Sequence, residues 1–135
     1  MEKIILLNMC ILALLLACAT AGSVNAGTED AAEYLNRGRD FLRGGNYDDA
    51  IRELSQSLAI DNGQVEAYSL RGQAYTGKGD YDRAIDDLNA ALSITPDHVG
   101  ILLFRAGIYV RKGDIDRATK DFNTAHMIRP DYGKH

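Results

Sequence analysis

Three histidines, two cysteines and several adjacent carboxylates are the side chains of this 135-residue sequence that could take part in catalysis or metal binding. The histidines, His98, His126 and His135, lack the HExxH spacing that holds zinc, and no cysteine accompanies them. Adjacent acids such as Asp86 and Asp87 point apart on a helix, because residues i and i+1 do not face each other. The sequence therefore predicts no catalytic residue, metal site or cofactor, and a protein that is not an enzyme.

Three arginines recur at equal intervals along the chain, and an acid follows each of them at the same distance. The pairs are Arg37 and Glu53, Arg71 and Asp87, and Arg105 and Asp121. A row of arginines alone would favour anion binding, whereas cations that each bring their own acid favour ion pairing. We therefore expect each arginine to form a partly buried ion pair with an acid of this series. The partner is either the acid that follows it in the same repeated segment or one in an adjacent segment.

The net charge of −4 gives no reason to expect a nucleic-acid-binding protein, which typically carries a basic patch. The charge is uneven along the chain. Residues 31–64 carry four basic and six acidic side chains, whereas residues 99–132 carry six basic and four acidic ones. This asymmetry either orients a partner, favours head-to-tail stacking of copies, or is an ordinary solvated surface.

Residues 1–26 have the order of a secretory signal peptide, with Lys3 before an apolar run over 4–17 and small residues after it. The run has 14 residues, fewer than the roughly 20 that a transmembrane helix needs. We therefore predict a signal peptide with a small-residue exit or tether, cleaved at Ala21 or Ala26, and a protein exported across the inner membrane. A retained membrane anchor is a weaker alternative.

Cys18 permits a second interpretation of this segment. Residues 15–18 resemble a bacterial lipobox, whose cysteine is acylated, although Leu16 stands where a smaller or β-branched residue is usual. Otherwise Cys18 is an ordinary small residue near the end of the signal peptide. The chain from residue 27 onward has no cysteine, so a disulfide bond or thiol chemistry is not expected there.

The remainder of the chain is a tandem repeat with a constant period. The phrase GNYDDAI at 45–51 recurs as GDYDRAI at 79–85 and as GDIDRAT at 113–119. The period divides the chain into units 31–64, 65–98 and 99–132. A fixed period of this length is typical of a repeat protein, in which each unit buries its apolar face on its neighbour.

Each unit is expected to form two helices of roughly 13 residues, because apolar residues follow helical spacing and glycines separate the two halves. Small residues recur where the two helices would cross closely. Asn46, Asp80 and Asp114 follow the separating glycines and are expected to cap the second helices. Thr95 and Pro96 are expected to be the cap and first position of the helix that opens the third unit.

The pattern resembles the tetratricopeptide repeat, a helix-turn-helix unit of about 34 residues. The matching residues are Tyr34, Gly38, Phe41, Ala50 and Leu54 in the first unit, Tyr68, Gly72, Tyr75, Ala84, Leu88 and Pro96 in the second, and Leu102, Ala106, Tyr109, Ala118, Phe122 and Pro130 in the third. The departures are arginine before the small residue, where the family has leucine, and Asn62 in place of the first proline. The resemblance implies an all-α domain over 27–135, a right-handed superhelical solenoid of three units and six helices.

The last helix is more polar than its counterparts. Thr119 and His126 stand where the earlier units have isoleucine and leucine, which leaves Phe122 and Ile128 as apolar residues on this side. We expect the third unit to close the stack without a seventh helix and to end the chain. A dimer interface at this end is the alternative.

The resemblance also implies a concave groove, lined by the first helices, that holds a segment of a partner. The groove positions are Asn36, Arg39, Arg43, Glu66, Ser69, Leu70, Gln73, Leu103, Phe104 and Gly107. Leu70, Leu103 and Phe104 are the expected anchors, because buried apolar and aromatic groups dominate binding energetics. Leu103 and Phe104 could instead be core residues, although adjacent residues do not share one helix face.

Some members of the family bind the C-terminal carboxylate of chaperones through lysines and asparagines in this groove. The corresponding positions are Leu35, Arg39, Leu70, Gly100 and Phe104, of which only Arg39 has suitable chemistry. The sequence therefore gives no support to this type of binding.

These observations favour a non-enzymatic adaptor of the bacterial envelope, periplasmic or tethered to the outer membrane, that binds a protein or peptide. One alternative is a self-associating structural subunit that stacks through its repeat ends or forms a homodimer. Another is an accessory subunit of an envelope assembly, secretion or pilus complex. No nucleic acid is expected as a partner, and a membrane only through a lipid on Cys18 or a retained N-terminal segment.

Overall fold

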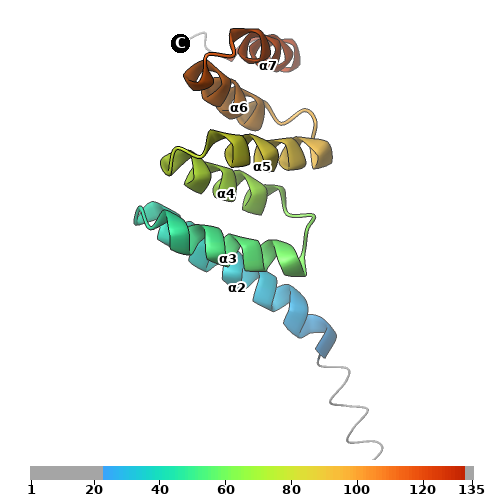
Figure 1. The fold of residues 1–135 in the computed structure, drawn as a ribbon. Coiled ribbons are helices and arrows are strands. Elements are labelled where there is room, and N and C mark those ends of the chain that lie inside the picture. The colour runs from blue at the N-terminus through green and yellow to red at the C-terminus, as the bar shows by residue number, and fades with distance from the viewer. Residues whose placement is uncertain (1–22, 133–135) are drawn as a thin grey trace, which may run out of the picture.

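A computed structural model describes residues 23–132, which form six helices arranged as three hairpins. The helices are α2 (Ser23–Arg43), α3 (Tyr47–Ile60), α4 (Val65–Gly77), α5 (Tyr81–Ile94), α6 (Val99–Lys112) and α7 (Ile115–Ile128). They stack in chain order, with α2 and α7 at opposite ends of the stack (Figure 1). The predicted signal sequence up to residue 22, with Cys18, and His135 lie outside the described residues.

Five of the helices have 13 or 14 residues, close to the predicted length. Helix α2 is longer, with 21 residues, and begins at Ser23, ahead of the first repeat unit. No proline interrupts the sequence between Ser23 and the repeat, so the first helix can extend beyond the unit that the period defines. None of the helices described between residues 23 and 132 is long and apolar enough to cross a membrane.

The turn inside each hairpin has the same geometry in all three units. Gly45, Gly79 and Gly113 have φ angles of 76°, 78° and 78°, in the left-handed region that favours glycine. The N–H of the residue after each glycine donates to a carbonyl in the last turn of the preceding helix, for example Asp80 N–H to Tyr75 O at 2.9 Å. This shared requirement explains why glycine recurs with the period.

The predicted helix caps are confirmed for two of three residues. A carboxylate oxygen of Asp80 accepts from the N–H of Arg83 at 3.2 Å, and one of Asp114 accepts from the N–H of Arg117 at 3.1 Å. Asn46 occupies the cap position of α3, but its side chain makes no capping hydrogen bond.

The predicted start of α6 at Thr95 and Pro96 is wrong. Thr95 is the cap residue that follows α5, Pro96 lies in the turn, and α6 begins at Val99 with His98 as its cap residue. The repeat spacing sets this start, since α4 begins at the equivalent position of the second unit, Val65. A proline in the turn between units is tolerated because its missing N–H is not needed by either helix.

Two apolar clusters fill the stack. One lies among α2, α3 and α4 around the fully buried Leu54, and the other joins α5, α6 and α7 around Leu88 and Ile108. The helices cross closely at the small residues, as predicted. A Cβ atom on Gly38 would lie only 2.5 Å from Leu54 Cγ, and Ala50 is completely buried.

The outer face of α7 is exposed at the end of the stack. Thr119 and His126 are exposed there, which agrees with their polar character. The apolar remainder is larger than predicted, because Ile115 and Met127 are 58% and 82% exposed in addition to Phe122 and Ile128. Helix α7 therefore presents both polar and apolar side chains on a face that packs against no other described helix.

Candidate protein-binding groove

The repeated arginines form the predicted ion pairs. Arg71 donates from Nε and Nη2 to the two carboxylate oxygens of Asp87 at 2.8 and 2.7 Å, and Arg105 does the same with Asp121. In the first unit, Arg37 Nε lies 2.9 Å from Glu53 Oε2, without the alignment of a hydrogen bond. The hydrogen bonds to the paired acid raise the pKa of Arg71 above its usual value.

The same arginines also connect neighbouring units. Arg71 Nη1 donates to Ser55 Oγ at 2.9 Å, and Arg105 Nη1 donates to Asn89 Oδ1 at 2.6 Å, in each case one unit back along the chain. Arg37 has no unit before it and contacts Glu33 in its own helix instead. Because the guanidinium groups of Arg71 and Arg105 are committed to these partners, the two arginines hold the stack together and do not form an anion site.

The predicted groove residues lie on helices α2, α4 and α6, and all of them are accessible to some degree. Asn36, Arg43, Glu66, Gln73 and Gly107 are exposed, and the remaining five are half-buried. Arg39 connects two of these helices, donating to Asn36 Oδ1 at 2.9 Å and to Glu66 Oε1 at 2.5 Å. Leu70 packs partly against the apolar cluster around Leu54. The structure thus brings the residues of α2 and α4 together through Arg39.

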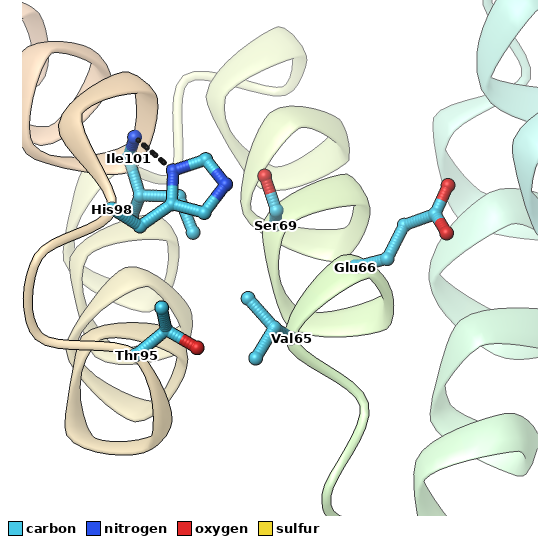
Figure 2. A pocket seen from close by; sticks show the side chains of 6 residues that line it. All are labelled: Val65, Glu66, Ser69, Thr95, His98 and Ile101. Carbon is cyan, nitrogen blue, oxygen red and sulfur yellow. Dashed lines mark hydrogen bonds between the residues drawn. The ribbon is translucent and has the colours of Figure 1, made fainter.

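A first hollow lies where α4 and α6 begin (Figure 2). It has a volume of about 460 Å³, and its lining residues are Val65, Glu66, Ser69, Thr95, His98 and Ile101. His98 Nδ1 accepts from the N–H of Ile101 at 3.2 Å, so the proton of the neutral ring is on Nε2. Figure 2 shows the Glu66 carboxylate directed away from His98, in agreement with its bond to Arg39. Hydroxyl and imidazole groups are therefore the polar groups that face this hollow.

A second hollow lies toward the ends of the same two helices. It has a volume of about 130 Å³, and its lining residues are Thr76, Leu103, Phe104, Gly107, Ile108 and Arg111. Its wall is almost wholly apolar. Leu103 and Phe104 both line it while also packing against the core, so the groove and core interpretations each hold in part.

Several residues of these hollows, including Thr76, His98 and Arg111, are not among the groove positions predicted from the sequence. Arg111 lies four residues after Gly107, which lies four residues after Leu103, and this spacing places all three on one face of α6. That signal was available in the sequence. The contribution of Thr76 was not, because it depends on how α4 sits against α6.

Between residues 30 and 132, whose side chains the structure describes, there is no group of three histidine, cysteine or acidic side chains placed to hold a metal ion. The two hollows instead offer apolar walls with a few hydrogen-bonding groups at their edges. Such a combination suits the recognition of a polypeptide segment.

Solved structures with the same fold include a crystal structure of MamA protein, which is 26% identical, has a TM-score of 0.72, and is aligned over 80% of this chain and 59% of that one. The second TPR of Spaghetti (RPAP3) bound to the HSP90 peptide SRMEEVD is 21% identical, with a TM-score of 0.73 and coverage of 79% and 99%. The Arabidopsis OM64 TPR domain is 18% identical, with a TM-score of 0.74 and coverage of 79% and 88%. The chain thus spans about three fifths of MamA. No protein of curated function matches it.

These neighbours confirm the predicted fold, an all-α right-handed superhelical solenoid of three helix-turn-helix units. Two sequence models described as tetratricopeptide repeat match the chain, one over residues 35–99 and the other over residues 75–132. The matches overlap and together extend from residue 35 to residue 132, so the chain belongs to the tetratricopeptide repeat family.

Proposed function

We propose that this chain is a non-enzymatic adaptor that holds a segment of a partner protein in the groove lined by α2, α4 and α6. The observation that carries the proposal is the pair of hollows at opposite ends of the junction between α4 and α6. An extended segment that follows these helices would reach both hollows. The half-buried side chains of Leu103 and Phe104 would then become fully buried, which favours binding.

The relatives support a peptide as the class of ligand. The second TPR of Spaghetti was solved with an HSP90 peptide, and the second TPR domain of human RPAP3 with an HSP70 peptide. The groove of this chain differs in chemistry from a carboxylate-binding groove, since leucine, glycine and phenylalanine occupy positions where such a groove uses lysine and asparagine. The proposal therefore concerns a different peptide sequence.

Selection of peptides from a displayed random library tests this function. The peptides that are retained would be titrated into isotope-labelled protein, and the perturbed amide signals would be mapped by NMR. We expect the perturbed residues to cluster on α2, α4 and α6. Perturbations confined to α7 or to the second helices would overturn the proposal, as would the failure of any peptide to bind.

We further propose that the adaptor works in the bacterial envelope, in the periplasm or attached to the outer membrane. The support is the order of residues 1–26, with an apolar run that is followed by small residues. Fusion of residues 1–30 to alkaline phosphatase, which is active only after export, tests this location in a bacterium. Labelling of the full chain with radioactive palmitate, compared with Cys18→Ser, separates lipidation from simple cleavage at Ala21 or Ala26. An inactive fusion would contradict the envelope role.

Self-association is the second candidate function, favoured by the exposed face of α7. Phe122 and Met127 are 43% and 82% exposed on this helix, and the third unit is basic where the first is acidic. A second copy could therefore cover α7, either with its acidic first unit or with its own α7. Sedimentation velocity over a range of concentrations tests this, with Phe122→Glu as the variant expected to remain monomeric. The same surface would serve an accessory subunit of an envelope complex.

A further inference from the structure

The second hollow has the dimensions of a site for one apolar side chain. Its volume of about 130 Å³ leaves room for one bulky apolar side chain, and Leu103, Phe104 and Ile108 form its walls. Gly107 leaves space at its mouth, because a Cβ atom built there would meet no other atom within 4 Å. The hollow is therefore open to a side chain that arrives from the groove.

The charge at this end of the groove is positive. Arg111 lines the hollow, is exposed, and makes no ion pair with any side chain between residues 30 and 132. Its neighbour Lys112 is already paired with Asp82, and Lys78 is paired with Asp48 in the same way one unit earlier. The lysines at the ends of α4 and α6 thus already have acidic partners, whereas Arg111 has none among these residues and is left for a ligand.

The first unit presents a similar cation. Arg43 occupies the position in α2 that Arg111 occupies in α6, and its side chain is 73% exposed and 3.7 Å from the nearest acid, Asp40. The equivalent position in α4 is Gly77, where the ring of Tyr47 packs so closely that a Cβ atom would lie 2.4 Å from it. The ends of the first helices thus offer two accessible arginines.

We infer that the occupant of the groove is an acidic segment that inserts one bulky apolar side chain into the hollow beside Phe104 and pairs a neighbouring carboxylate with Arg111. This inference rests on the proposed function and specifies its ligand. The apolar side chain supplies most of the affinity, because it leaves water for a wall of carbon atoms. The carboxylate supplies orientation and selectivity, since an exposed ion pair contributes little affinity by itself.

Fluorescence anisotropy with three matched peptides tests the inference. The first probe is a short fluorescein-labelled peptide of glutamate and serine with one central phenylalanine. The second has alanine in place of the phenylalanine, and the third has lysine in place of each glutamate. We expect the first probe to bind about tenfold more tightly than either of the others, and this preference over the lysine probe to shrink at high salt.

Two variants of the protein locate the binding. Gly107→Leu fills the hollow and is expected to abolish binding of the first probe without lowering the melting temperature, because leucine is a better helix former than glycine. Arg111→Glu is expected to weaken that probe by about threefold, because it removes an exposed ion pair and places a like charge beside the glutamates of the peptide. Lys120→Glu makes the same charge change on the exposed surface of α7 and is expected to leave binding unchanged.

The outcomes separate this inference from the proposed function. Equal binding of the acidic and lysine probes, or unchanged binding by Arg111→Glu, would overturn the assignment of an acidic ligand. Unchanged binding by Gly107→Leu would overturn the assignment of the hollow. No binding of the first probe would overturn the inference as a whole. In each case the proposed function would still stand if peptides selected from the random library bind on α2, α4 and α6.

Discussion

At the scale of single residues, the repeated arginines connect each repeat unit with the one before it. Arg71 donates two hydrogen bonds to Asp87 in its own unit and one to Ser55 in the preceding unit. Asp87 is only 5% exposed, so its charge depends on this single guanidinium group for compensation. The arginine that replaces the leucine of the family therefore has a structural reason at this position.

We expect Arg71→Ala to lower the free energy of unfolding by about 3 kcal/mol, because it leaves a buried carboxylate without its partner. Urea denaturation followed by circular dichroism measures this change. Arg117→Ala is the matched control, since its side chain is 69% exposed and it lies 3.4 Å from Asp114. Arg117→Ala should lower the free energy of unfolding by less than about 1 kcal/mol. Equal losses in the two variants would contradict the role given to Arg71.

The pKa of Arg71 is raised, first because its guanidinium donates hydrogen bonds to Asp87. A base with a raised pKa stabilises the fold fully below its unfolded-state pKa, which for arginine lies far above neutral pH, and loses that contribution only as the pH rises through its folded-state pKa. The destabilisation by Arg71→Ala should therefore be the same at pH 6 and pH 9. If the destabilisation by Arg71→Ala became markedly smaller between pH 6 and pH 9, a group other than Arg71 would be titrating near the ion pair with Asp87.

Gly38 tests the close crossing of α2 and α3. Gly38→Ala would place a methyl group 2.5 Å from Cγ of the fully buried Leu54, so we expect a net loss of about 1–2 kcal/mol in unfolding free energy. Gly107→Ala is the control, because the added methyl group meets open space and helix propensity favours it by about 1 kcal/mol. Thermal melts of both variants would show opposite shifts, and a stabilised Gly38→Ala would contradict the crossing.

At the scale of the elements, each hairpin depends on a glycine turn that is followed by a cap residue. The turn geometry is the same in all three units, but the caps are not. Asp80 and Asp114 each accept a backbone hydrogen bond at the start of the second helix, whereas Asn46 accepts none. The first hairpin must therefore depend more on packing, for instance of Leu54 beneath Gly38.

This difference predicts unequal effects of cap removal. Asp114→Ala should lower the free energy of unfolding by about 1 kcal/mol, because the N–H of Arg117 loses its acceptor at the end of the helix. Asn46→Ala should lower the free energy of unfolding by only about 0.3 kcal/mol, since no side-chain hydrogen bond is lost. Chemical denaturation of the two variants decides the point, and a larger effect from Asn46→Ala would refute it.

At the scale of the whole molecule, the helices form a linear stack in which each unit contacts only its neighbours (Figure 1). Helices α4 and α5 lie inside the stack, with packed helices on both sides, while α7 has one open face that exposes Phe122 and Met127. In such a stack, stability is close to a sum of unit terms and interface terms. The end unit, with one interface, should open more readily than the middle one.

Native-state hydrogen exchange would measure this gradient. We expect the amides of α7 to exchange through openings of lower free energy than those of α4 and α5, because α7 lacks a second neighbour. Exchange followed by NMR gives the opening energy at each residue. Uniform protection from α4 through α7 would indicate that the described units unfold as one body, which would contradict the prediction.

The sequence by itself determined the architecture. Turn glycines, small crossing residues and the arginine–acid pairs all recur once in every repeat unit, because each belongs to the local geometry of one helical hairpin. The predicted groove positions on α2, α4 and α6 came from the resemblance to the tetratricopeptide repeat. Local capping signals showed their limits, since the residue types gave Asn46 a capping hydrogen bond that is absent and placed the start of α6 too early, at Thr95 and Pro96.

Only the tertiary structure revealed the hollows between α4 and α6. The second hollow forms where Thr76 of α4 meets the face of α6 that carries Leu103, Gly107 and Arg111. Its volume depends on the distance and angle between two helices, which arise from the packing of many side chains in the core. The spacing of residues along one helix contains no such distance. For that reason the sequence placed Phe104 in the groove but could not show the hollow beside it, nor the cation at its edge that pairs with no described acid.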